Sequence, residues 1–188
     1  MQYKTQLVVT YAATLPMLVS SDSLTIGNIV VLGIGALFPD IDHPDSFIGQ
    51  RVPLVSDGVR KVLGHRGIVH SVIGALCFTL LTRFLIAVFD WPVEWSTWFL
   101  IGFLAHLIED SFSKHGIAWL RPIYHKNLQF GFKKIYYTTG GTSEYIVFVL
   151  AVAVLIYQLI QTELFMQLTV TFPEIQNIIN HIKNTYLV

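Results

Sequence analysis

Histidines and carboxylates gather where apolar segments of this chain begin or end. Two aspartates follow one apolar run in the sequence PDIDHPDS, two histidines precede the next in GHRGIVHS, and a histidine and an aspartate end a third in AHLIEDS. These six residues are Asp40, Asp42, His65, His70, His106 and Asp110. Imidazole and carboxylate together suit zinc, manganese or iron better than calcium. The pattern therefore predicts a transition-metal site of the kind that hydrolytic enzymes use.

The spacing within two of these groups indicates how the side chains can reach one ion. His106 and Asp110 are four residues apart, so on a helix they share one face. Asp40 and Asp42 follow a helix-breaking proline, and an extended backbone there can turn both carboxylates toward one cavity. Like charges held close resist joint ionisation without a cation. The alternatives are that the two aspartates are loop acids and that His106 is a packed core histidine.

His65 and His70 are five residues apart, which is a poor spacing for two ligands on one continuous helix. Glycines at 64 and 67 permit His65 to lie on a loop and His70 on the following helix. Arg66 lies between the two and is either a phosphate clamp or a plain loop cation.

Two glutamates are candidates for the general base of a hydrolytic reaction. Glu109 lies next to the His106–Asp110 pair, and Glu144 begins an apolar segment. A carboxylate that is not consumed as a metal ligand can accept the proton of an attacking water. Glu144 can instead complement the dipole of the helix that it begins, so both interpretations stay open.

The apolar segments that must position these residues predict an integral membrane protein. The chain has 188 residues, 53% of them hydrophobic and 13% charged, and its mean hydropathy is +0.59. This composition excludes a disordered chain and a basic nucleic-acid binder, and the single cysteine excludes a disulfide scaffold. A spanning helix needs about 20 apolar residues, and buried helices of a soluble core are the alternative for the shorter runs. We therefore predict an all-α helical bundle of four to five spans, from residues 7–20, 24–38, 68–89, 95–108 and 145–160.

The distribution of basic residues predicts the orientation of this bundle. Ten of the twelve Lys and Arg residues fall in residues 1–6 and in the two long loops, 39–67 and 109–144. Because positive charge accumulates on the cytoplasmic side, we expect a multi-pass protein of the bacterial inner membrane with its polar site facing the cytoplasm. Residues 1–162 form the predicted membrane-embedded domain, and residues 163–188 an amphipathic tail.

Three motifs resemble those of the bacterial membrane-bound metal-dependent hydrolase family, in its LexA-regulated membrane-bound type. They are PDIDHPDSFIGQR (39–51), HRGIVHS (65–71) and HLIEDSFSKHGIAWLRP (106–122), and the resemblance covers roughly residues 1–160. It implies metal roles for the six residues named above, with Arg66 and Ser71 as close support. Two positions depart from the family: Gln6 stands where relatives commonly have an early histidine, and Val69 where a threonine is usual.

Together these observations predict a membrane-bound hydrolase that cleaves a phosphoester with a metal-activated water. Six ligands are more than one ion needs, which favours two ions, with zinc ahead of manganese or iron. A site at the bilayer surface suggests a lipid or lipid-linked substrate, and nucleic acid is not an expected partner. Residues 124–137 mix bases with aromatics and either touch anionic headgroups or form a plain cytoplasmic loop. The rival class is a non-catalytic metal-binding membrane protein or a metal-ion carrier.

Overall fold

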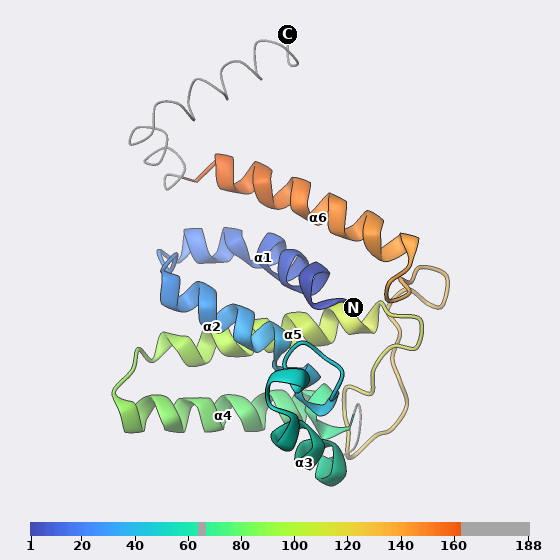
Figure 1. The fold of residues 1–188 in the computed structure, drawn as a ribbon. Coiled ribbons are helices and arrows are strands. Elements are labelled where there is room, and N and C mark those ends of the chain that lie inside the picture. Colours follow the sequence, from blue (N-terminus) through green and yellow to red (C-terminus); the bar gives the residue numbers. More distant parts are fainter. Residues whose placement is uncertain (64–66, 163–188) are drawn as a thin grey trace.

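A computed structural model describes residues 1–63 and 67–162, and over those residues the chain is all-helical with no named strand (Figure 1). This confirms the predicted all-α class. The predicted amphipathic tail, 163–188, lies outside the described residues. The α-helices are α1 (Tyr3–Ser20), α2 (Ile26–Leu37), α3 (Pro53–Leu63), α4 (Val72–Phe89), α5 (Glu94–Ser111) and α6 (Thr142–Ile160). Short 3-10 helices form at η1 (Phe38–Asp42), η2 (Gly49–Arg51) and η3 (Ile68–His70).

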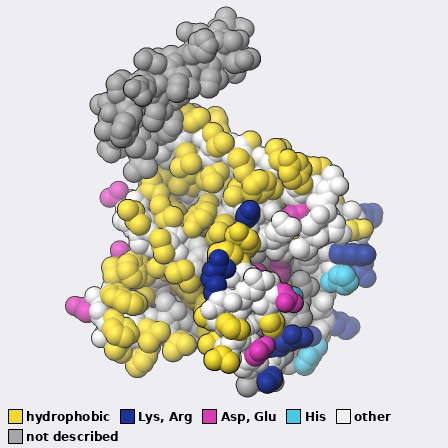
Figure 2. Space-filling model, in the orientation of Figure 1, with side chains coloured by type: hydrophobic (Ala, Val, Ile, Leu, Met, Phe, Trp, Pro, Cys, Tyr) yellow, Lys and Arg dark blue, Asp and Glu magenta, His cyan; other side chains and the backbone are white. Residues whose placement is uncertain are grey.

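Two of these helices, α4 and α6, are long and apolar enough to cross a membrane. Only 17% of α4 and 11% of α6 is buried within the molecule, so most of their apolar side chains face outward. A core helix of a soluble protein would bury its apolar residues against other elements. Figure 2 shows these hydrophobic side chains spread over the helices, while most of the visible basic side chains and the histidines gather toward the end that carries the loops.

The predicted count of four to five spans is supported only roughly. Every predicted apolar run forms a helix, but α2 has 12 residues and is about 18 Å long, less than the ~30 Å of a bilayer core. Helix α3, inside the loop 39–67, was not predicted. Its sequence PLVSDGVRKVL places Leu54 and Val55 among exposed apolar side chains and ends in basic residues, so it is amphipathic rather than continuously apolar.

Helix α5 is the centre of the bundle. Helices α1, α2 and α4 pack against it, and α6 packs against α1 (Figure 1). Phe99, Phe103 and Leu107 of α5 are buried in the main hydrophobic cluster, together with Val69 and Ile117 from the loops that flank α4 and α5. The cluster lies directly beside the polar ends of the helices, so it fixes where those ends stand relative to one another.

Two glycines let the backbones of α2 and α5 approach closely. A Cβ atom on Gly35 would collide with the carbonyl oxygen of Phe99, and one on Gly102 would collide with the carbonyl oxygen of Leu32. Small residues permit such crossings where a side chain would force the helices apart. Gly102 lies about one turn before His106 on α5, and Gly35 lies two residues before the end of α2, which leads to Asp40, so the crossing determines the separation of His106 and Asp40.

Replacing Gly102 by alanine tests the importance of this crossing. We expect Gly102→Ala to lower the free energy of unfolding by about 1–3 kcal/mol, because the added methyl group overpacks a backbone contact. The measurement is thermal unfolding of the detergent-solubilised protein. Gly58→Ala is the matched control: nothing lies within 4 Å of a Cβ at Gly58 in α3, and the change should leave the melting temperature equal or slightly higher. Equal melting temperatures for both variants would contradict the close crossing.

Candidate metal site

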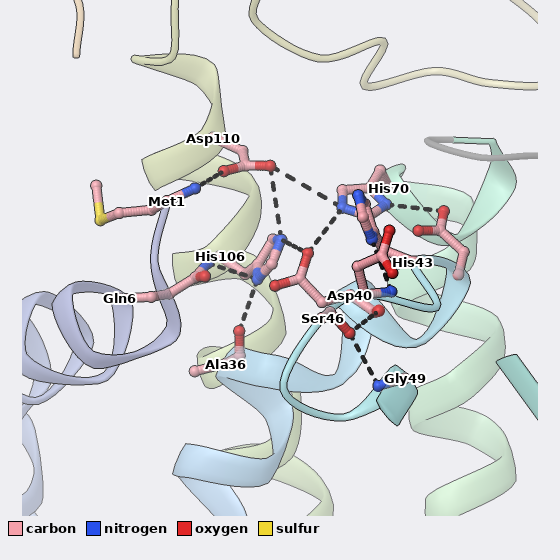
Figure 3. A network of polar contacts seen from close by, with 12 residues as sticks. Met1, Gln6, Ala36, Asp40, His43, Ser46, Gly49, His70, His106 and Asp110 are labelled. Atoms are coloured by element: carbon pink, nitrogen blue, oxygen red, sulfur yellow. Dashed lines mark hydrogen bonds and ion pairs between the residues drawn. The ribbon is translucent and has the colours of Figure 1, made fainter. Parts of the chain in front are cut away.

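Two histidine nitrogens and two carboxylate oxygens face one another at the loop-bearing end of the bundle (Figure 3). Nε2 of His70 lies 3.8 Å from Oδ1 of Asp40 and 3.9 Å from Oδ2 of Asp110. Nε2 of His106 lies 3.9 Å from the same Asp40 oxygen and 3.7 Å from the same Asp110 oxygen. These four atoms, which we name the donor ring, come from three separate segments of the chain: η1 supplies Asp40, η3 supplies His70, and α5 supplies both His106 and Asp110.

Asp40 reaches the donor ring because α2 continues into the 3-10 helix η1. Pro39 stands in the first turn of η1, where a missing N–H costs no hydrogen bond. The extended backbone that we expected for Asp40 and Asp42 is therefore wrong: both lie on this tight helical turn. The hydroxyl of Ser46 donates to the backbone carbonyl of Asp40 at 2.7 Å and holds the turn in place.

His70 ends the 3-10 helix η3, immediately before α4. We expected it on the helix itself, but Ser71 separates the two: its hydroxyl accepts a hydrogen bond from the N–H of Gly74 at 3.1 Å and caps α4. The backbone N–H of Val72 donates to the carbonyl of Trp119 at 2.9 Å, which ties this junction to the loop after α5. The cap therefore aims His70 inward rather than along the helix surface.

The second nitrogen of each ring histidine is held by an acceptor. Nδ1 of His106 lies 2.6 Å from the carbonyl oxygen of Ala36, and Nδ1 of His70 lies 3.2 Å from Oδ2 of the buried Asp42. An Nδ1–H that donates to a carbonyl or carboxylate fixes the tautomer, so Nε2 presents its lone pair to the donor ring. This arrangement is the usual one for metal-binding histidines.

Gln6 is buried against the other side of His106. Its amide lies 2.5 Å from Nδ1 of His106, and its Oε1 has no hydrogen-bond partner among the described residues. Nδ1 of His106 thus lies against both the amide nitrogen of Gln6 and the carbonyl oxygen of Ala36. Gln6 therefore stands behind a ring histidine and supports its orientation.

Asp110 is held from the side opposite the histidines. Its Oδ1 accepts a hydrogen bond from the hydroxyl of Tyr137 at 3.0 Å, and the α-amino group of Met1 lies 3.5 Å from the same oxygen. Burial, together with the neighbouring Asp110 carboxylate, raises the pKa of Tyr137, so the phenol keeps its proton as a donor. These two contacts on Oδ1 leave Oδ2 of Asp110 facing the histidines of the donor ring.

Electrostatics within the donor ring favour positive charge. Burial opposes a charged His70, but the neighbouring carboxylates of Asp40 and Asp42 outweigh it and raise the pKa of His70 to about 9. Burial likewise opposes a charged Asp40, yet His106 and His70 lower the pKa of that carboxyl. The metal-free protein therefore holds a proton where a cation would otherwise sit.

The donor ring fits a divalent transition metal. Asp40, His70 and His106 offer ligand atoms that all lie within 4.8 Å of one another. In a tetrahedral complex with metal–ligand bonds of about 2.0–2.2 Å, the ligand atoms are roughly 3.3–3.6 Å apart. The four histidine–carboxylate contacts of the donor ring, at 3.7–3.9 Å, are a few tenths of an ångström longer. Nε2 of His106 has no hydrogen-bond partner among the described residues although it is buried beside two carboxylates. A buried lone pair that faces anions is unfavourable unless a cation lies between them.

The other predicted site residues that the structure describes lie outside the donor ring. Asp42 contacts His70 from behind, and His65 and Arg66 lie outside the described residues. Glu109 accepts a hydrogen bond from the hydroxyl of Thr10 at 2.7 Å and lines an apolar cavity. Glu144 accepts from the backbone N–H groups of Gln2, at 2.5 Å, and Gly140, at 2.6 Å, so it joins two loops.

A polar cavity of about 570 Å³ opens onto the donor ring. Asp40, His70 and Asp110 line it, and Lys4 contributes a cation. Lys4 and Tyr137 were missed as site residues. No spacing pattern links Tyr137 to Asp110, since 27 residues separate them. Lys4 could have been predicted, because it lies two residues before Gln6, where relatives commonly have a site histidine.

Comparison with known proteins gives a family and partial relatives. A family model described as "YdjM inner membrane protein" matches residues 1–167. Inner membrane protein YdjM of Escherichia coli (strain K12) is 37% identical over 89 residues, which are 46% of this chain and 44% of that protein. Uncharacterized protein YvsG of Bacillus subtilis (strain 168) is 38% identical over 89 residues, 47% of this chain and 53% of that protein. The matched region thus spans about half the length of these relatives, and no solved structure matches.

Substitution of one donor at a time tests the metal site. We expect Asp40→Asn and His106→Gln to lower zinc affinity at least about 100-fold, because each removes one ligand from a four-atom set. The measurement is the zinc content of the purified protein, determined by inductively coupled plasma mass spectrometry after dialysis against a weak chelator. Asp45→Asn is the matched control, since Asp45 lines the same cavity but is exposed and does not belong to the donor ring. Equal metal content in Asp40→Asn and Asp45→Asn would overturn the assignment.

Proton release on metal binding tests the state of His70. Its pKa of about 9 lies above the ordinary 6.5, so the metal-free protein carries this proton at pH 7 and loses it only as the pH rises through 9. Zinc binding at pH 7 should release about one proton, and the affinity should rise with pH up to about 9. Calorimetry in two buffers of different ionisation enthalpy measures this release. Absence of proton release at pH 7 would mean that His70 is already neutral.

Proposed function

The chain belongs to the YdjM family of inner membrane proteins, and from that membership and the donor ring we propose that it is a metal-dependent hydrolase that cleaves a phosphoester. The single observation that supports this most is the pair of buried histidines, each with one nitrogen held by an acceptor and the other facing two carboxylates. A purely structural histidine pair would have no need of two opposed carboxylates.

The proposed metal is zinc, with manganese or iron as the alternatives. Such an ion, when bound, lowers the pKa of water and polarises a phosphoryl oxygen. In the proposal, Asp40, His70, His106 and Asp110 hold the first ion. Asp42 and His65 are the candidates for holding a second, because Asp42 is buried beside His70 and His65 is near it in sequence.

Basic residues and glutamates of the chain supply substrate binding and proton transfer in this proposal. Lys4, which lines the cavity, and Arg66 are the cations that would hold the phosphate. Hydrolysis forms a bond from water oxygen to phosphorus and breaks the ester P–O bond, and the departing alcohol takes a proton. Glu109 and Glu144 stay the predicted general bases, although each already accepts hydrogen bonds in the fold.

The proposed topology is multi-pass, with the site on the cytoplasmic side. The donor ring lies at the end of the bundle where α4 begins and α5 ends, and the long loops with most of the basic residues are at this end (Figures 1 and 2). The positive-inside rule then assigns this end to the cytoplasm. Membrane lipids are the proposed surroundings of α4 and α6.

A hydrolysis assay separates the enzyme from the rival metal-binding class. We expect the zinc-loaded protein to cleave p-nitrophenyl phosphate or bis(p-nitrophenyl) phosphate, and His70→Ala to reduce the rate about 100-fold or more, since it removes a donor and the partner of Asp42. Asp45→Asn should keep the rate within about twofold. Metal-loaded protein that cleaves neither ester, yet carries zinc into vesicles, would replace the hydrolase with a metal-ion carrier.

A further inference from the structure

A second, apolar cavity of about 700 Å³ lies between α1, α5 and α6. Aliphatic side chains from all three helices line it, including Val9, Ala13, Leu104, Ala105, Ile146 and Val147. Among the described residues that line it, the one carboxylate is Glu109, which accepts a hydrogen bond from Thr10. We name this cavity the apolar groove.

The apolar groove is open along its side and has the length of one membrane leaflet. Met17, Ile108 and Ile146, which line it, are 48%, 45% and 54% exposed. Along α5 and its C-cap residue the lining runs from Ile101 to Phe112, which at 1.5 Å per residue is about 16 Å. The hydrocarbon core of a bilayer is ~30 Å thick, so the groove covers about half of it.

One end of the apolar groove meets the polar cavity at Asp110. Tyr137 lines the groove and donates its hydroxyl to Oδ1 of Asp110, while Oδ2 of Asp110 belongs to the donor ring. Met1 lines both cavities. The two cavities therefore adjoin at the Tyr137–Asp110 contact, with a charged side and a hydrocarbon side.

We propose that the apolar groove binds the hydrocarbon chain of a membrane lipid whose phosphate lies in the polar cavity. This rests on the proposed function and names its substrate class: a lipid phosphoester that enters sideways from the bilayer. The phosphate would face Lys4 and the donor ring, and the chain would lie along α1 and α5. The linkage between the two parts would then cross the Tyr137–Asp110 contact.

The size and lining of the apolar groove favour a hydrocarbon chain over a helix. A helix about 10 Å wide and 16 Å long occupies roughly 1,300 Å³, nearly twice the volume available. A helix from a partner would also leave the polar cavity unused, whereas an amphiphile fills both. Burial of apolar chain surface stabilises binding by about 25 cal/mol per Å².

Photolabelling tests the proposal without requiring hydrolysis. The probe is a hexadecyl phosphonate with a diazirine at the end of its chain, added to the full-length protein in phosphatidylcholine nanodiscs. The probe has a C–P bond in place of a phosphoester and therefore is not a substrate for hydrolysis. Its labelling pattern thus reports binding whether or not the protein cleaves esters. We expect the α1 and α5 residues of the groove to be labelled several times more often than the lipid-facing surface of α4.

A groove-filling variant and its control make this test decisive. Ala13→Trp places an indole in the apolar groove and should lower groove labelling about tenfold, while labelling of α4 stays the same. Ala87→Trp, on exposed α4 and outside the groove, should leave both unchanged. Unchanged zinc content in Ala13→Trp verifies that the donor ring of this variant is intact. Groove labelling that only equals that of α4, or that Ala13→Trp does not reduce, would overturn the proposal.

Discussion

The structure depends on one electrostatic conflict: two buried imidazole lone pairs and two carboxylates face the same small space. The four contacts between them are 3.7–3.9 Å long, too long for hydrogen bonds and too short for water to screen. Without a cation this arrangement would cost free energy, since like charges and lone pairs would oppose one another in a water-poor interior. A proton on His70 relieves part of the conflict, and a divalent metal would relieve all of it.

The surrounding fold keeps the four groups from moving apart. The glycine crossing of α2 and α5 holds Asp40 against His106, and the carbonyl of Ala36 at the same crossing fixes the His106 ring. Asp42 holds His70, and Tyr137 holds Asp110. Each donor is thus held on its outer side, so the ring is preformed rather than assembled by the ion. Helices α4 and α6 bury little of their apolar surface within the molecule, and in the proposed topology they would set the depth of the site in the bilayer.

The sequence predicted the helices of the fold better than the positions of the side chains at their ends. Continuous apolar runs mark helices whatever they pack against, so five of the six described α-helices were predictable, all but α3, and so was the i, i+4 pair His106 and Asp110. The turn conformation of Asp40 and the capped end before α4 were not, because they depend on Ser46, Ser71 and Trp119. The contact from Tyr137 to Asp110 crosses a long loop without periodicity. The direction of Glu109, toward Thr10, depends on how α1 packs, which no local pattern specifies.

X-ray absorption at the metal edge of the purified protein tests the central claim most directly, because it reports the ligand atoms themselves. If the donor ring holds the ion, the spectrum will show about two imidazole nitrogens and two carboxylate oxygens at roughly 2.0–2.2 Å. His106→Gln will then remove one imidazole contribution. A shell of six oxygens without imidazole, or bound metal whose spectrum is the same in His106→Gln, would contradict the assignment of the site.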